Sequence, residues 1–331
     1  MILYRFWIRT SMAAMIAISA TVAIACNVPV FRYALERWRP DLCQVIVFHE
    51  EKLSAFDELQ IRWVEEETTA KGGYANAEII QCKVGSETDR GRKELWETLS
   101  RQPNISMPYV VMRTSLGTGE LVTHWSGPLQ EVSKAHLFDS PVRRELSRRL
   151  LAGDSVVWLM LKSDDASKNK ATRDLLATEL ERLGKTLKLP DGIGLPGSEL
   201  YSEVPLFLKF TILELDPKDP AEQLLVRLMS GFEKDAKSEP LLAPVFGRGR
   251  ALEVISAKQL NAGLIEDLTM FLCGACSCQV KERNPGFDLL LATNWNSELY
   301  GEDGEAPPPV TSLERTPTKP TPLTIPPGRK R

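Results

Sequence analysis

Three cysteines within six residues, Cys273, Cys276 and Cys278, form the group in this sequence best suited to chemistry. Cys-x-x-Cys spacing suits a metal ion or a reversible disulfide bond. A closed zinc site needs four ligands, however, and the cluster supplies three with no histidine nearby. A redox role needs a thiolate, and the cluster follows an expected helix C-terminus, where the helix dipole disfavours one. Cysteines of an exported chain can oxidise, and the N-terminus predicts export, so a structural disulfide is the default expectation. Metal binding, a redox or partner thiol, and free thiols are the alternatives.

Cys43 and Cys82 form a second group. Both lie at or in expected strands that the fold would bring close together, which suggests that they pair in a disulfide. The sixth cysteine, Cys26, ends an apolar run and is a candidate for lipidation. If Cys26 carries a lipid, one of the other five cysteines must be unpaired or bonded elsewhere.

Four further residues are weaker ligand-site candidates. His49 and Glu50 follow the first expected strand, at the end where α/β folds present ligands. Arg248 and Arg250, in a Gly-Arg-Gly-Arg turn, would suit an anion, and the alternative is a solvated turn. The sequence has no phosphate-binding loop, Gly-x-Ser-x-Gly or His-Glu-x-x-His motif, or dinucleotide fingerprint, so we assign no catalytic residue.

The N-terminus predicts export. Arg5 and Arg9 precede an unbroken run of small and apolar residues from 11 to 25, which ends Ala-Ile-Ala before Cys26. This pattern is typical of a secretory signal peptide, and the run is shorter than the roughly 20 residues of a spanning helix. The cysteine after Ala-Ile-Ala resembles a bacterial lipoprotein cleavage site. A lipidated Cys26, an uncleaved anchor and a cleaved signal remain as alternatives, and each places the rest of the chain outside the cytoplasm.

The remaining chain predicts an α/β protein. A buried strand over 45–48 precedes a helix, a strand over 77–84, a helix over 92–99 and a hairpin over 109–125, which Pro108 introduces. The first of these helices has four apolar residues along one side, namely Leu53, Phe56, Leu59 and Trp63.

This β-α-β-α-β-β order, with a proline before the third strand, resembles the thioredoxin-like fold. The resemblance covers residues 45–128 and implies that Pro108 is a cis-proline. Active thioredoxins place Cys-x-x-Cys directly after the first strand, whereas this chain reads His49-Glu50-Glu51-Lys52-Leu53 there. The resemblance therefore implies a domain that lacks the dithiol of an oxidoreductase.

The C-terminal half repeats the order. It has a strand over 156–161, a helix over 170–187, a strand over 206–213 and a hairpin that contains Pro244. By the same resemblance, this half is a second thioredoxin-like domain with Pro244 as its cis-proline. Its first strand is followed by Lys162-Ser163-Asp164-Asp165, again without cysteine.

We predict five segments from these patterns. They are a signal peptide or anchor (1–26), a first thioredoxin-like domain (27–130), a helical connector (131–153), a second such domain with the cysteine cluster (154–300) and a disordered proline-rich tail (301–331). The connector carries four arginines that we expect on a solvated helix face or, alternatively, in a patch for anionic lipid or an acidic partner, namely Arg143, Arg144, Arg148 and Arg149.

Composition limits the classes of partner. Among 331 residues, 41 Lys and Arg stand against 44 Asp and Glu, so the chain has no basic footprint for nucleic acid. We expect a membrane contact through the N-terminus, a protein partner in the cell envelope, and no cofactor unless a metal binds the cysteine cluster.

Two functional hypotheses follow. The first is a membrane-tethered, non-catalytic scaffold or interaction protein made of two degenerate thioredoxin-like domains. The second is a thiol or metal handler that uses Cys273, Cys276 and Cys278. The chain also resembles exported bacterial proteins of unassigned function, in Cys-Asn-Val-Pro-Val-Phe-Arg-Tyr from residue 26 and Cys-Ser-Cys-x-Val-Lys from residue 276, a likeness that implies no activity.

Overall fold

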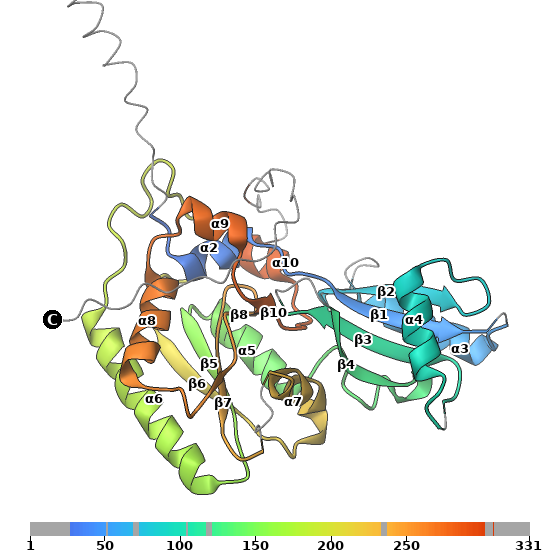
Figure 1. Cartoon of the computed structure of the whole chain (residues 1–331). Coiled ribbons are helices and arrows are strands. Elements are labelled where there is room, and N and C mark those ends of the chain that lie inside the picture. The colour runs from blue at the N-terminus through green and yellow to red at the C-terminus, as the bar shows by residue number, and fades with distance from the viewer. Residues whose placement is uncertain are drawn as a thin grey trace, which may run out of the picture.

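The chain folds as an α/β protein with two mixed sheets, which lie side by side in the computed structural model (Figure 1). We call each sheet with its covering helices a unit. The residues that the structure describes are 27–50, 52–68, 73–103, 105–116, 121–232, 237–301 and 307. The predicted signal segment with Cys26 and nearly all of the predicted tail lie outside them. Within the described residues, no helix is both long and apolar enough to cross a membrane.

The first sheet has four strands in the order β2-β1-β3-β4. They are β1 (Cys43–His49), β2 (Ala77–Lys83), β3 (Tyr109–Ser115) and β4 (Leu121–Pro128). β1 is parallel to β2, and β3 is antiparallel to both β1 and β4. The apolar middle of β1, with the β-branched residues Val45, Ile46 and Val47, favours this central position, where both faces of a strand are buried.

Helices cover both faces of the first sheet. α3 (Ala55–Glu67) lies on one face through Ile61 and Val64, and the turn η2 (Leu129–Glu131) packs on the same face. α4 (Arg90–Leu99) covers the other face through Leu95, Trp96 and Leu99. α3 begins at a capping box between Ser54 and Asp57, which fixes its first turn.

The second sheet repeats the strand order in its core, as β6-β5-β7-β8. β5 is parallel to β6 and antiparallel to β7. Two short strands extend it, because β10 pairs with β8 and β9 pairs with β7. The six strands are β5 (Val156–Leu161), β6 (Phe210–Leu215), β7 (Leu241–Phe246), β8 (Arg250–Ala251), β9 (Ile255–Ser256) and β10 (Phe287–Asp288).

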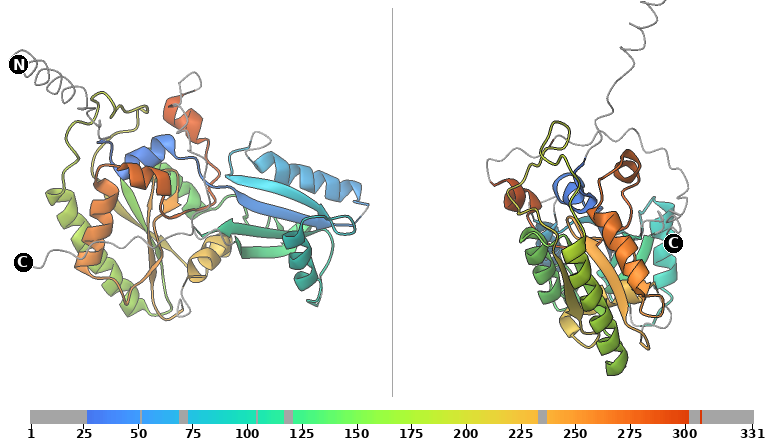
Figure 2. Two further views of the ribbon diagram at one scale, coloured as in Figure 1. Left: turned by 45° about the horizontal axis from the view of Figure 1, so that its top comes forward. Right: turned by 90° about the vertical axis from the view of Figure 1, so that its left-hand side faces the viewer.

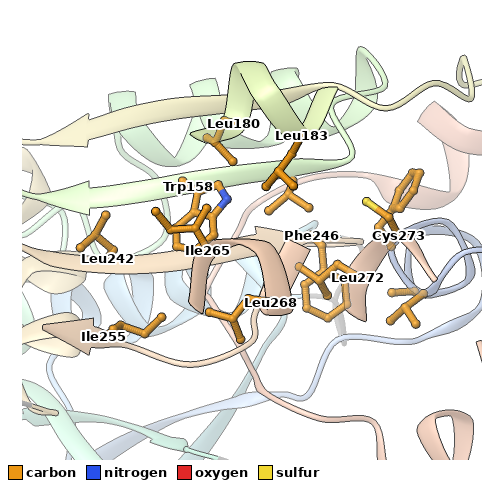
Figure 3. Packing of buried hydrophobic residues seen from close by; sticks show 14 of the residues in the cluster. Trp158, Leu180, Leu183, Leu242, Phe246, Ile255, Ile265, Leu268, Leu272 and Cys273 are labelled. Carbon is orange, nitrogen blue, oxygen red and sulfur yellow. The ribbon is translucent and has the colours of Figure 1, made fainter. Parts of the chain in front are cut away.

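The second unit has three layers. One face packs against α6 (Ala166–Thr186), α8 (Ala262–Cys273) and α2 (Val30–Arg37). The other face packs against α5 (Pro141–Leu151), α7 (Gln223–Ser230), which follows the turn η3 (Pro220–Glu222), and α10 (Trp295–Tyr300). Alternation along β5 explains both layers, since Trp158 points to the first face and Leu159 to the second. Figure 3 shows Trp158, Phe246, Leu268 and Leu272 in the first of these layers.

The N-terminal helix α2 belongs to the second unit. Phe31 and Trp38 pack in the core formed by Trp158 and Phe246, and Figure 2 shows the helix, in blue, among the elements of that unit. The predicted boundary at residue 27 is therefore wrong. Nearly the whole helix is buried, including Arg32.

A buried ion pair fixes α2 in place. Arg32 Nε lies 2.8 Å from Glu36 Oε1, and the Arg32 guanidinium donates to the carbonyls of Ser202 and Val204 at 2.7 and 2.6 Å. Glu36 Oε1 also accepts from the backbone N–H groups of Tyr201 and Ser202. Buried charges need such partners, and these bonds tie the first helix to a loop some 170 residues later.

Residues 288–293 join the two units. The Asn76 side chain donates to the Leu289 carbonyl at 3.2 Å and accepts from the Leu291 N–H at 2.8 Å. Ala75 forms an antiparallel bridge with Ala292. This segment docks on the second unit through β10, and it also closes the edge of the first unit.

The two prolines predicted as equivalent occupy different positions. The Met107–Pro108 bond is cis and precedes β3, whereas Pro244 lies inside β7 opposite Trp158, and among the described bonds only Met107–Pro108 is cis. The prediction for Pro244 is therefore wrong. Pro240 is the equivalent residue, since it precedes β7 as Pro108 precedes β3. The Pro108 carbonyl accepts from Leu129 N–H and the Pro240 carbonyl from Ala257 N–H, both at 2.9 Å.

Candidate functional site

The cysteine cluster lies where the N-terminal segment meets the second unit. α8 ends at Cys273, and the next residues run antiparallel to residues 28–30. Val30 N–H donates to the Gly274 carbonyl at 3.0 Å, and Cys276 N–H donates to the Val28 carbonyl at 2.9 Å. Cys273 and Cys276 both belong to the core that holds α2. The two cysteines therefore lie in the core contact that holds residues 28–30 and α2 on the second unit.

Burial makes the described thiols of the cluster poor nucleophiles. Cys273 and Cys276 are 3% and 1% exposed and form no disulfide with each other in this structure. Burial raises the pKa of Cys273 to about 12, so its reactive thiolate form is scarce at neutral pH. Cys278 is the first residue of α9 (Cys278–Arg283), and its side chain lies outside the described part, so its pairing stays a prediction. Among the described residues, no group of three or more cysteine, histidine or acidic side chains could hold a metal ion.

The predicted disulfide between Cys43 and Cys82 is wrong. In the register of β1 and β2, Cys82 lies opposite Phe48, five residues from Cys43, which is roughly 16 Å along a strand. The two side chains also point to opposite faces of the sheet, because they belong to separate cores. A disulfide requires Cα atoms within about 7 Å, so these cysteines cannot pair in this fold. Burial raises the pKa of the Cys43 thiol far above its usual range.

Cys82 instead belongs to a small polar cluster at the end of β2. Burial and a hydrogen bond to Glu87 raise the pKa of Cys82 to about 12. Glu87 accepts two bonds from the Arg92 guanidinium at 3.0 Å, which hold the pKa of this carboxyl well below its usual range. The Glu87 carboxylate therefore accepts a hydrogen bond from the Cys82 thiol, which keeps its proton and is not activated as a nucleophile.

The loops that follow the first strand of each unit contain no sulfur. His49 ends β1, and its Nδ1 lies 2.6 Å from the Glu50 carbonyl, while Glu50 itself is exposed. After β5, Asp165 is the N-cap of α6 and accepts from the N–H groups of Ser167 and Lys168. Both loops start helices, and His49 and Glu50 have no further described partner that would define a ligand site.

The two arginines of the β7–β8 turn have structural roles. The Arg248 guanidinium donates to the carbonyls of Leu35 and Glu36, at 2.7 and 3.1 Å, and so caps the C-terminus of α2. Gly247, with φ +59°, allows this approach, because a Cβ there would lie 2.6 Å from the Ala34 Cβ. The anion site proposed for Arg248 is therefore filled by helix carbonyls.

Arg250 is also fully engaged. It forms a buried ion pair with Asp288 on β10 and donates to the carbonyls of Asn284, Pro285 and Gly286. Burial raises the pKa of Asp288 to about 6, although the Arg250 guanidinium opposes the shift. Arg250 thus anchors β10 and has no donor directed at solvent for a ligand.

A groove with a volume of about 390 Å³ lies over α5. Arg143 lines it but is buried, and donates to Ser140 and to the carbonyls of His136, Leu137 and Leu290. Arg144 pairs with Asp139, and Arg148 pairs with Glu145 at 2.6 Å. The predicted solvated face of four arginines is therefore wrong for Arg143, and the others at this groove are neutralised by neighbouring acids.

His124 makes the stability of the fold depend on pH. It is buried on β4, its Nε2 lies 2.6 Å from Thr114 Oγ1, and burial lowers its pKa to about 4. The unfolded chain binds this proton with a pKa near 6.5, so stability is lost as the pH falls below that value. Replacing His124 by Gln should remove about 2 kcal/mol of the loss between pH 7 and 5, measured by urea unfolding. The other titrating groups are the same in both proteins, so the difference between them reports His124 alone. If the stability of His124→Gln falls between pH 7 and 5 as much as that of the parent chain, the prediction is wrong.

The comparisons with known proteins yield no relative. No protein-family model matches this chain, and neither a curated protein nor a solved structure matches it.

Proposed function

We propose that this chain is a non-catalytic scaffold or interaction protein, built on two degenerate thioredoxin-like domains. It is exported, held at a membrane through its N-terminal segment, and binds a protein partner in the cell envelope. The basic, apolar sequence that ends at Cys26 supports the export and tethering.

The shared topology of the two sheets supports the thioredoxin-like assignment. In each unit the second, first, third and fourth strands lie next to one another in that order, as β2-β1-β3-β4 and β6-β5-β7-β8. The third strand of each unit is antiparallel to the first. Pro108 and Pro240 introduce those third strands, and their carbonyls accept equivalent hydrogen bonds. The helices after the first and second strands cover opposite faces in each unit.

The observation that carries the proposal is the chemistry at the first loop of each unit. Neither loop contains a cysteine, and Cys43, Cys82 and Cys273 are buried, with pKa values raised by burial. A domain that exchanges disulfides needs an accessible, activated thiolate at this place. Without such a thiolate, the role that we propose for the two units is to bind a partner through their surfaces.

Membrane sedimentation and a measurement of thiol reactivity, both on the full chain, test the proposal. The protein is expressed with its own N-terminus, and we expect it to sediment with membranes, whereas a variant without residues 1–26 should stay in the supernatant. After detergent extraction, Cys43, Cys82 and Cys273 should react with a thiol reagent at least 100-fold faster in denaturant than in the native state. Stoichiometric bound metal, or a disulfide among Cys273, Cys276 and Cys278 that is readily reduced, would instead favour the thiol or metal handler.

A further inference from the structure

The outer side of α3 carries an apolar stripe that faces solvent. Phe56, Leu59 and Trp63 are 59%, 59% and 39% exposed, at helical spacing of three and four residues. Ile61 and Val64, on the opposite side of the helix, already fill the contact with the sheet. α3 lies at the far end of the molecule from α6 and α8 (Figure 1). The Trp63 ring also meets the Phe138 ring edge-on, with 6.3 Å between the ring centroids. The stripe is therefore a second, mostly exposed apolar face on a helix that packs on the sheet through Ile61 and Val64.

The same helix is strongly acidic. Its 13 residues include one basic residue, Arg62, and five acidic ones, Asp57, Glu58, Glu65, Glu66 and Glu67. Three of these acids form the last turn, which contains no basic residue. The helix dipole makes its C-terminus negative, so this turn favours a cation. The surface thus combines exposed aromatic and aliphatic groups with a net negative charge.

Charge decides which occupant fits this surface. A second copy of α3 would bring like charges together, and an anionic lipid surface would be repelled in the same way. An occupant with positive charges and some apolar groups would gain from both features. The geometry points to a segment of this chain itself: the exposed face of α3 binds residues 308–331.

The sequence of this segment matches the surface. It contains one acidic residue, Glu314, and five basic ones, Arg315, Lys319, Arg329, Lys330 and Arg331. Its apolar residues that lie among the prolines are Val310, Leu313, Leu323 and Ile325. Proline-rich chains dock well on exposed aromatic rings such as Trp63 and Phe56. Thirty residues follow Gly301, and an extended chain of that length spans up to roughly 100 Å. This reach is about five times the radius of gyration of roughly 20 Å expected for a compact chain of 331 residues. This inference does not depend on the function proposed above.

Photo-crosslinking of the full chain tests the contact. A benzophenone amino acid is placed at position 59 in one variant and at position 195 in another, because Leu59 and Leu195 are equally exposed, at 59% and 61%. Crosslinked peptides are mapped by mass spectrometry. We expect residues 308–331 to be captured from position 59 at least five times more often than from position 195. Replacing Arg329, Lys330 and Arg331 by Ser, or Glu66 and Glu67 by Gln, should lower that yield at least threefold.

Two results would overturn the proposal. One is an equal capture of residues 308–331 from positions 59 and 195. The other is a capture from position 59 that neither set of charge substitutions changes, since charge selects this occupant. Thermal unfolding of each variant is the control. Leu59, Glu66 and Leu195 are exposed and Glu67 is half-buried, so we expect these variants to melt with the parent chain.

Discussion

Replacing Arg250 by Met is expected to destabilise the folded chain by about 3–5 kcal/mol, because the change leaves Asp288 buried without its partner. The guanidinium also satisfies three carbonyls of residues 284–286, which the methionine cannot do. Its loss should release β10 from β8 and thereby weaken the segment that joins the two units. Urea unfolding followed by circular dichroism measures the change.

A double-mutant cycle separates the ion pair from the other contacts of Arg250. Asp288→Asn removes the charge that Arg250 compensates, so Arg250→Met should cost at least about 1 kcal/mol less in that background. Equal costs in both backgrounds would show that the pair contributes nothing beyond the carbonyl contacts. Arg90→Met is the matched control, because the Arg90–Glu94 pair is exposed and should contribute less than about 1 kcal/mol.

The sequence predicts local elements of this fold well where their apolar pattern is strong. The run from Val156 to Leu161 is a strand with the predicted bounds, because six consecutive apolar residues suit burial on both faces. The helix expected over 170–187 exists as α6 and extends four residues further at its start, where Asp165 caps it. Short-range chemistry decides such features, so they can be read from a few neighbouring residues.

The errors concern which surface an element meets. The apolar side expected for α3 contains Phe56, Leu59 and Trp63, yet the buried side is formed by Ile61 and Val64. Both sides carry apolar residues, so periodicity alone could not choose between them. The sequence favours Pro244 as the equivalent of Pro108 because Pro244 lies in the second hairpin. Pro240 instead precedes the strand, and only the strand register shows this difference.

The candidate site residues show the same limit. Arg248 and Arg250 suggest a ligand site from sequence because their partners lie far along the chain, at Leu35 in one case and Asp288 in the other. Cys43 and Cys82 lie in neighbouring strands, as predicted, but parallel register separates them by five residues. Each role depends on pairing between distant segments, which no local pattern encodes.

Replacing Phe31 by Ala should destabilise the second unit by about 3–5 kcal/mol, although Phe31 precedes the first sheet in sequence. Phe31 is 5% exposed and packs in the core with Trp158 and Phe246, so its removal leaves a cavity under α2. Tyr74→Ala is the control, with an expected change within about 0.5 kcal/mol because that ring is 52% exposed.

Amide hydrogen exchange locates the effect of Phe31→Ala. We expect faster exchange in β5, β7 and α8, which surround this core, and unchanged protection in β1 and β2. Faster exchange confined to β1 and β2 would instead support a first domain that begins at residue 27. The expected pattern follows from the packing of α2, because a helix stabilises the sheet that buries it, wherever it stands in the sequence.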